Sequence, residues 1–424
     1  MKKSLLALAA MGAFASVAQA QSSVTVYGVI DEAVIGGNNR SSLGNNATAK
    51  TNTAGTTGVV RSTGFGVVAA GESTGRIGFK GVEDLGGGTS ALFTLETAID
   101  PGATTLITTT RQAFVGLKKN GIGSGLVGSQ NTVIYDAVLA TDPSGVNNMG
   151  GNLITVSTKG AQGAPSSANT GNGLTNNAGY NTRVANALQF KSDQFAGFNV
   201  RLMYVANNKN VTQTDTGGAG AGVGGITNVS GGSAAVDYTW NKLYLTANYQ
   251  QFTAASNGNA QSTAPVLFGV GTDGATGSTV SAGTNVNDIG QYYAATYDFG
   301  VLKAFAQYVN RKGTSVSSPN YYNKYSAQQI GVNSYVTPAI QVWASAAFGK
   351  YQTMAAFSAT NTQYTPGTAN LNGFQVGSNY WLSKRTNLYA IYGQMAQSNQ
   401  AMTSGANTTA YNYNNYGVGV RHTF

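Results

Sequence analysis

The chain has 424 residues, of which only 9% are charged, whereas a soluble domain usually has about a quarter. Its 57 Gly and 23 Tyr suit strands, tight turns and membrane interfaces better than helices. It has no Cys and one His, which leaves no disulfide framework and nearly excludes a transition-metal site, so we expect no cofactor.

The start of the chain has the pattern of a secretory signal peptide. Two lysines precede an apolar run from Leu5 to Val17, and residues 18–20 form a small-x-small cleavage site. The run is too short for a membrane-anchoring helix. We therefore predict a signal peptide over residues 1–20 and a single domain over residues 21–424. Basic residues elsewhere are spaced singly, so we expect no nucleic-acid partner despite the net charge of +9.

After this segment, apolar and polar residues alternate with the period of two that is typical of a β-strand. In residues 24–35, Val24, Val26 and Ile30 share one face, and Asp31 lies on the other. An apolar face opposite a charged one fits a barrel with lipid outside and water inside. We therefore predict that Asp31 faces away from the lipid.

A loop rich in Gly, Asn and Thr is predicted from there to about residue 71. The alternation returns in residues 75–85, where Arg76 and Lys80 lie on the face opposite to the apolar residues. Gly86-Gly87-Gly88 predicts a tight turn, because glycine readily adopts the positive φ angles of such turns.

Residues 109–130 read as two strands joined by a turn, with Arg111, Ala113 and Val115 on one face of the first. The alternation then stops, and the following residues show neither a period of two nor a fully apolar helix. In a barrel of many strands such a segment can fold inward and narrow the channel. We predict that residues 131–160 form this constriction loop.

The same alternation recurs to the end of the chain. It gives about sixteen strands joined by alternately short and long connections, which predicts an all-β, transmembrane, antiparallel β-barrel. Short connections such as 86–88 and 299–300 would face the periplasm. Long connections such as 207–232 and 253–287 would face outside.

The last strand is predicted to close the barrel. Its lipid-facing residues are predicted to be Tyr416, Val418, Val420, His422 and Phe424. On that face His422 is not placed to act as a catalytic base or a metal ligand. An apolar and aromatic strand that ends in Phe also resembles the signal by which the barrel-assembly machinery recognises such proteins for insertion.

Several segments, in order along the mature chain, resemble the trimeric general porins of Gram-negative bacteria, most closely the Burkholderia-type and Neisseria-type porins. They are SSVTVYGVID from Ser22, GRIGFKGVEDLGGG from Gly75, TRQAFVGL from Thr110, YDAVLATDP from Tyr135, WLSKRTNLYAIYG from Trp381 and GVGVRHTF from Gly417. In that family the third outer loop folds into the lumen and carries carboxylates opposite a ladder of arginines.

Matched position by position, the resemblance implies which residues line the constriction. The basic side would be Arg76, Arg111 and Arg183, the acidic side Asp136 and Asp142, with Lys80 and Asp31 as second-rank candidates. Each of the three arginines lies on an inward face by the alternation or at the start of a strand.

Two departures from the family pattern affect this constriction. Asp142 is followed by Pro143-Ser144-Gly145, where the family often continues with Pro-Glu-Phe-Gly-Gly, so one carboxylate is missing. Gly128-Ser129-Gln130 stands where Gly-Arg-Gln is common, so one basic residue is lost as well.

The prediction is therefore an outer-membrane porin of a Gram-negative bacterium, a homotrimer by resemblance, embedded in outer-membrane lipid. Small hydrophilic solutes and inorganic ions would diffuse through it passively, with a preference for anions, because clustered lumen arginines favour them. We expect no enzymatic activity, because the chain has no histidine in the middle of a strand to act as a base. The alternatives are a substrate-specific outer-membrane channel and a secreted β-rich adhesin.

Overall fold

The computed structural model describes residues 23–42, 59–103, 105–155, 179–207, 227–256, 286–315, 322–355, 365–398 and 410–424. The predicted signal peptide, residues 1–20, lies outside these ranges. No helix among the described residues has the length and apolar character needed to cross a bilayer.

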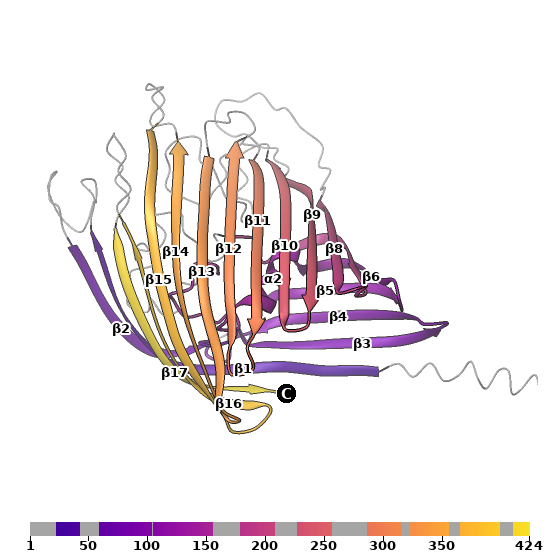
Figure 1. Cartoon of the computed structure of the whole chain (residues 1–424), viewed down its shortest axis with the longest axis horizontal. Coiled ribbons are helices and arrows are strands. Elements are labelled where there is room, and N and C mark those ends of the chain that lie inside the picture. The colour runs from indigo at the N-terminus through magenta and orange to yellow at the C-terminus, as the bar shows by residue number, and fades with distance from the viewer. Residues whose placement is uncertain are drawn as a thin grey trace, which may run out of the picture.

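The described strands form one antiparallel sheet that curves round and closes on itself (Figure 1). They are β1 (Ser23–Ser42), β2 (Val59–Ala69), β3 (Arg76–Gly86), β4 (Thr89–Ile99), β5 (Ile107–Lys119), β6 (Gly123–Asn131), β7 (Arg183–Ser192), β8 (Phe198–Asn207), β9 (Thr227–Trp240), β10 (Leu243–Ser256), β11 (Val286–Asp298), β12 (Lys303–Ser315), β13 (Tyr322–Thr337), β14 (Ile340–Ala355), β15 (Thr365–Trp381), β16 (Thr386–Gln397) and β17 (Tyr411–Thr423). From β3 onward each strand pairs with the next, and β17 pairs with β1. The predicted all-β, antiparallel barrel is confirmed.

β1 is long enough to pair with two strands on the same side. Residues 23–29 pair with β3, and residues 32–42 pair with β2. Since β2 and β3 follow one another along one side of β1, the seventeen strands occupy sixteen positions around the barrel. The loop predicted up to about residue 71 is wrong over residues 59–69, which form β2. Its Ser-Thr-Gly-Phe-Gly stretch has the composition of a loop, and this conceals the strand in the sequence.

The faces of the strands follow the predicted alternation. Val24, Val26 and Ile30 are exposed on the outside of β1, whereas Asp31 is fully buried inside. The residues of β17 predicted to face lipid, Tyr416, Val418, Val420, His422 and Phe424, are all exposed. Phe424 and Gly28 exchange two backbone hydrogen bonds of 3.1 Å, so the last residue of the chain is joined to β1.

Short turns connect the strands at the end of the barrel where the C-terminus lies (Figure 1). Gly86, Gly87 and Gly88 form one of them with φ angles of 84°, 58° and 73°, as predicted. By the rule that short turns of such barrels face the periplasm, the opposite end faces outside. Two long connections are shorter than predicted, because β9 begins at Thr227 and β11 begins at Val286.

One segment leaves the wall and runs through the interior of the barrel. Residues 131–155, called the lumen segment from here on, follow β6 and contain the helix α2 (Val133–Thr141). The helix packs against inward-facing side chains of the wall, and it contains Tyr135 and Asp136, in keeping with the absence of a fully apolar helix pattern in the sequence. Residues 156–160 of the predicted constriction loop lie outside the described residues.

Candidate functional site

Helix α2 begins at a local capping signal. Thr132 is the N-cap, and its side chain accepts a hydrogen bond of 3.2 Å from the backbone N–H of Tyr135. Val133, Ile134, Ala137 and Val138 are buried against side chains that point inward from the wall. The apolar face of the helix therefore packs against the wall, and helix and wall side chains together form one hydrophobic core inside the barrel.

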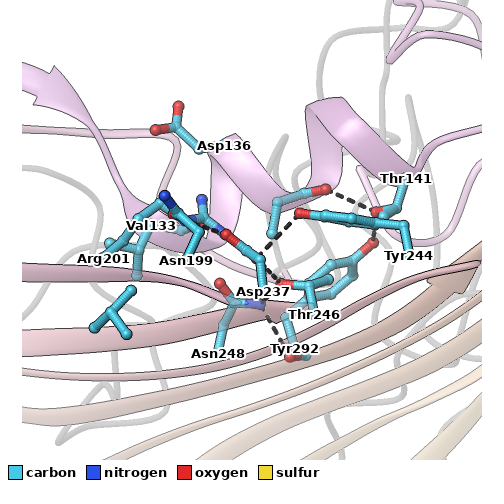
Figure 2. Close-up of polar contacts among 12 residues, drawn as sticks. Val133, Asp136, Thr141, Asn199, Arg201, Asp237, Tyr244, Thr246, Asn248 and Tyr292 are labelled. Atoms are coloured by element: carbon cyan, nitrogen blue, oxygen red, sulfur yellow. Dashed lines mark hydrogen bonds and ion pairs between the residues drawn. The ribbon is translucent and has the colours of Figure 1, made fainter. Parts of the chain in front are cut away.

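An ion pair on neighbouring strands holds the first turn of α2 (Figure 2). Arg201 of β8 donates from Nε to Asp237 Oδ2 at 3.0 Å and from Nη2 to Asp237 Oδ1 at 2.7 Å. Its Nη1 donates to the carbonyl oxygen of Val133 at 2.9 Å. Thr246 and Tyr244 of β10 also donate to Asp237, so the carboxylate, on β9, is fixed from the strands on both sides. Figure 2 shows Asp136 pointing away from this cluster.

The end of α2 is held by hydroxyl groups and by Asp142. Thr141 Oγ1 and Tyr292 OH share a hydrogen bond of 2.5 Å. The Asp142 carboxylate accepts from the backbone N–H of Ser144 at 2.9 Å and of Val146 at 3.1 Å, and from Asn152 Nδ2 at 2.6 Å. Asp142 is only 5% exposed, and these partners all belong to the lumen segment. Its carboxylate therefore stabilises the fold of that segment.

The tip of the lumen segment reaches the opposite wall. Gln375 of β15 accepts a hydrogen bond from Asn147 Nδ2 at 2.6 Å and donates to the Gly150 carbonyl oxygen at 3.0 Å. Asn148 donates to the Ala70 carbonyl oxygen at 3.0 Å, in the break between β2 and β3. The lumen segment therefore spans the barrel interior from β8–β12 to β15 and the β2–β3 break.

The three predicted arginines are brought together near the start of the lumen segment. Arg76 interacts electrostatically with Arg111, and Arg183 interacts with both. The guanidinium of Arg183 lies over the ring of Tyr135, 5.3 Å from its centroid. Tyr135 in turn stacks with Tyr180 at 6.0 Å. Burial raises the pKa of the Tyr180 hydroxyl well above its ordinary value, and Tyr135 and Asp142 add to this, so Tyr180 stays neutral.

A β-bulge turns Arg111 inward. In the pairing of β4 with β5, Glu96 faces Gln112 and Thr97 faces Thr110, which leaves Arg111 as the extra residue. Val115 is 58% exposed on the outer face, whereas Arg111 is 8% exposed. The predicted grouping of Arg111 with Ala113 and Val115 on one face is therefore wrong, because the bulge changes the alternation between them.

Carboxylates lie beside two of the basic residues here. Glu96 Oε1 accepts from Arg111 Nε at 2.6 Å, and Glu96 Oε2 accepts from the Tyr27 hydroxyl at 3.1 Å. Asp136 Oδ2 accepts from Lys191 Nζ of β7 at 2.7 Å. Within the described part of the chain, Arg76 and Arg183 form no salt bridge. Their Nε atoms are buried and have no hydrogen-bond partner among the described residues.

The two second-rank candidates do not contact these arginines directly, but Asp31 accepts from the backbone N–H of Ser73, whose Oγ accepts from Arg76 Nη2 at 2.6 Å. Asp31 is buried and accepts hydrogen bonds from the Tyr389 hydroxyl at 2.5 Å and from the backbone N–H of Glu72 at 2.9 Å. Lys80 is exposed, and its Nζ lies 5.3 Å from the centroid of the Tyr27 ring. Asp31 thus holds the break between β2 and β3 in place. The Tyr27 ring lies between Lys80 and Glu96, since its face contacts Lys80 and its hydroxyl donates to Glu96.

Comparison with known proteins agrees with this architecture. The profile of the Gram-negative porin family matches residues 7–400. The chain belongs to this family. An outer membrane porin protein of Bordetella pertussis is 28% identical over 450 aligned residues that cover 100% of both chains. Outer membrane porin protein 32 of Delftia acidovorans is 31% identical over 221 residues, which cover 50% of this chain and 52% of that protein.

Solved structures of porins share the fold. The anion-selective porin from Comamonas acidovorans has a TM-score of 0.63 and 20% identity, with 95% of this chain and 100% of that chain covered. OmpT of Vibrio cholerae, in its trimer form, has a TM-score of 0.54 and 14% identity, with 95% and 99% covered. The protein is therefore a porin of the Gram-negative outer membrane, a channel for small solutes and ions rather than an enzyme.

Several charged residues inside the porin were not among the sequence-predicted candidates. They are Glu72, Glu96, Lys191, Arg201, Asp237, Asp288, Arg311 and Arg421. A signal for several of them exists in the sequence, because they alternate with outward apolar neighbours, as Glu96 does with Leu95, whereas Arg311 stands between Asn310 and Lys312 and gives no such signal. Glu72 lies between two strands and has no such signal. Its carboxylate accepts from Asn379 Nδ2 and Asn387 Nδ2 and lies 3.5 Å from Arg421 Nε.

The porin offers no metal centre among its described residues, where no group of three or more His, Asp or Glu side chains gathers. Its single histidine, His422, is exposed on the outer face and shares a 2.9 Å hydrogen bond between its Nδ1 and Thr386 Oγ1. The placement of His422 on the lipid face is as predicted.

Proposed function

We propose that the lumen segment and the arginine cluster form the constriction of an anion-preferring channel. The observation that supports it most directly is the local charge around Tyr135. Three arginines (Arg76, Arg111 and Arg183) meet one glutamate (Glu96), which is an excess of 3 − 1 = 2 positive charges. Lys191 and Asp136 neutralise each other nearby.

This excess favours anions because guanidinium groups that lack a carboxylate can interact with a passing anion. The two carboxylates predicted to lie opposite the arginines, Asp136 and Asp142, already have other hydrogen-bond partners. Asp142 accepts hydrogen bonds from its own segment and Asp136 is paired with Lys191. The name of the Comamonas acidovorans porin, which describes it as anion-selective, supports the same preference.

A homotrimer is part of the proposal. Its support is the resemblance to trimeric general porins and the trimer form in which OmpT of Vibrio cholerae is described. A trimer of three separate channels would close in three equal conductance steps in a planar bilayer.

The test is the reversal potential of the purified protein in a planar bilayer under a salt gradient. We expect an anion-signed potential for the native chain. Arg183→Gln and Arg111→Gln should each lower the anion-to-cation permeability ratio, by up to about fivefold, since unit charges 4 Å apart in water interact by about 1 kcal/mol. Glu96→Gln should raise the ratio.

Arg385→Gln is the matched control, because it removes the same charge from an exposed residue in the turn between β15 and β16. It should leave the reversal potential unchanged. A cation-signed potential for the native chain, or equal potentials for Arg183→Gln and Arg385→Gln, would show that other charges govern the channel.

A further inference from the structure

Three lysines gather on the outer face of β12, β13 and β14. On β12, Val309 and Arg311 are buried inside, so Lys312 points outward, and it is exposed. Lys324 of β13 is directly opposite Lys312 in the strand register. Lys350 of β14 pairs with Ser326, two residues along β13 from Lys324 on the same face. By this register, Lys350 is the diagonal neighbour of Lys324, at about 7–8 Å.

This cluster lacks a compensating charge from the protein. Like charges directly opposite each other in a sheet are destabilising unless something neutralises them. Among the described residues none of the three forms a salt bridge, and the cationic Nζ of Lys312 lies 4.9 Å from the centroid of the Tyr322 ring. Residues 299–424 contain no Asp or Glu at all. The sequences that connect β13 and β14 to their neighbouring strands therefore have no acidic residue that could pair with these lysines.

The lysines lie toward the end of the barrel opposite to the short turns. Lys312 is close to the last residue of β12, Ser315, and Lys324 is close to the first residue of β13, Tyr322. The long connections begin there, so this level corresponds to the headgroups of the outer leaflet. A cluster of ammonium groups at headgroup level is placed to bind lipid phosphate.

An apolar groove lies on the outer wall beside the cluster, toward the short turns. It has a volume of about 770 Å³, and its lining includes small side chains between large ones. The small side chains are Ala247, Ala295, Ala306 and Ala346. Tyr293, Tyr308, Ile330 and Phe348, all exposed, project beside them.

The lysine cluster and the apolar groove are close enough for one molecule to contact both. Tyr308 lies four residues from Lys312 along β12, which is about 13 Å at the rise of an extended strand. One amphiphile can therefore place a charged group on the lysines and an acyl chain in the groove.

We propose that this face is a binding site for a phosphate-bearing lipid of the outer leaflet. The phosphate contacts Lys312, Lys324 and Lys350, and one acyl chain lies in the alanine-lined groove. A second copy of the chain is disfavoured as the occupant, because charged residues are depleted from the cores of protein interfaces.

A second groove on the outer wall provides an internal comparison. It has a volume of about 720 Å³, lies over β4–β8, and is lined by residues such as Val115, Leu117, Val127, Leu188 and Phe190 without any charged side chain. Neither groove has a charged lining residue, but the lysine nearest to the second groove on the same face, Lys119, lies beside the short turns, so acyl-chain binding alone would not distinguish the two.

The experiment is native mass spectrometry of the folded full-length protein in detergent, titrated with lipid A that carries two phosphates and with the same lipid stripped of both. We expect the native chain to retain the phosphorylated lipid at least tenfold better than the stripped one. The triple variant Lys312→Gln, Lys324→Gln, Lys350→Gln should lose at least tenfold in affinity for the phosphorylated lipid. The triple Lys→Arg variant should keep it.

Two further variants separate the parts of the site. Ala306→Phe with Ala346→Phe fills the groove and should weaken binding severalfold with the lysines intact. Val127→Ala with Leu188→Ala alters the other groove and should leave binding unchanged. Equal binding of the two lipids, or native-like affinity in the triple Gln variant, would overturn the phosphate site. Native-like affinity in the filled-groove variant would overturn the acyl-chain position.

Discussion

Wall glycines lie where the backbone of the lumen segment touches the barrel. A Cβ on Gly331 would lie 2.6 Å from Pro143 Cγ, and one on Gly373 would lie 2.5 Å from the Gly151 carbonyl oxygen. A Cβ on Gly393 would overlap the carbonyl oxygen of Gly150. The lumen segment is therefore held against the wall by close backbone contacts as well as by hydrogen bonds, and only glycine permits this approach.

Gly393→Ala should displace the tip of the lumen segment. The obstructing atom belongs to the backbone of Gly150, so no side-chain rotation can relieve the overlap, and overpacking of this kind costs about 1–3 kcal/mol. We expect the tip to move from β16 toward the lumen, which lowers the single-channel conductance in a planar bilayer. Gly125→Ala, where a Cβ meets nothing within 4 Å, is the control. Native conductance in Gly393→Ala would show that the tip does not limit the flow of ions.

Helix α2 is held at its two ends by interactions of different strength. Its first turn rests on the buried Arg201–Asp237 ion pair, whose side chains are 7% and 10% exposed. Its last turn rests on hydroxyl contacts, with Tyr292 bound to Thr141 and also accepting from Gln307 Nε2 at 2.9 Å. A broken buried ion pair leaves an uncompensated charge, whereas a lost hydroxyl removes only a neutral hydrogen bond.

Asp237→Asn should therefore loosen the lumen segment more than Tyr292→Phe does. We expect a loss of about 3 kcal/mol for the former, the low end for a broken buried pair. We expect about 1 kcal/mol for the latter. The measurements are the urea midpoint of the folded protein in detergent and the open-channel current noise, which should rise in the same order. Asp298→Asn, at the exposed last residue of β11, should change neither quantity. Equal effects of Asp237→Asn and Tyr292→Phe would indicate that the ion pair does not anchor α2.

The alternation of the strands made much of this arrangement predictable. Lipid requires an apolar side chain at every second position, so the inward directions of Asp31 and Arg76 follow directly from their neighbours. The bulge at Arg111 is different, because it inserts one residue without altering composition, and the grouping with Val115 fails there.

The lumen segment was predictable as a departure from alternation but not in its contacts. The partners of Asp136 and Asp142 depend on which strand passes nearby in space. Lys191 is far along the chain from Asp136, and Asn152 turns back on Asp142 through the shape of the segment itself. No spacing in the sequence indicates either contact.

Charge is distributed unevenly through the whole molecule. Residues 299–424 contain no Asp or Glu, so the acidic partners of this third of the chain come from elsewhere, as Asp288 does for Arg311 and Glu72 for Arg421. Basic residues on the outer wall have no such partner among the described residues. Among the described residues the interior is thus mostly paired, and the arginine cluster carries a local positive excess.

This local excess predicts how selectivity depends on salt. Screening shortens the reach of a charge from about 10 Å at 0.1 M to about 3 Å at 1 M ionic strength. We therefore expect the anion preference, measured as the reversal potential at a fixed concentration ratio, to be largest at a mean concentration near about 0.1 M and to fall steeply toward about 1 M. Arg183→Gln should show a smaller preference at low salt and a flatter dependence, because it removes a guanidinium that forms no salt bridge within the described residues.

A preference that does not change with salt would contradict this account. It would mean that anions are selected by direct contact at short range, where mobile ions do not screen, or by the width of the channel. The Gly393→Ala variant distinguishes these outcomes, because displacement of the tip alters the width and leaves the three arginines in place. If its conductance falls while its salt dependence stays that of the native chain, then the arginines set the sign of selectivity and the lumen segment sets the size of the current.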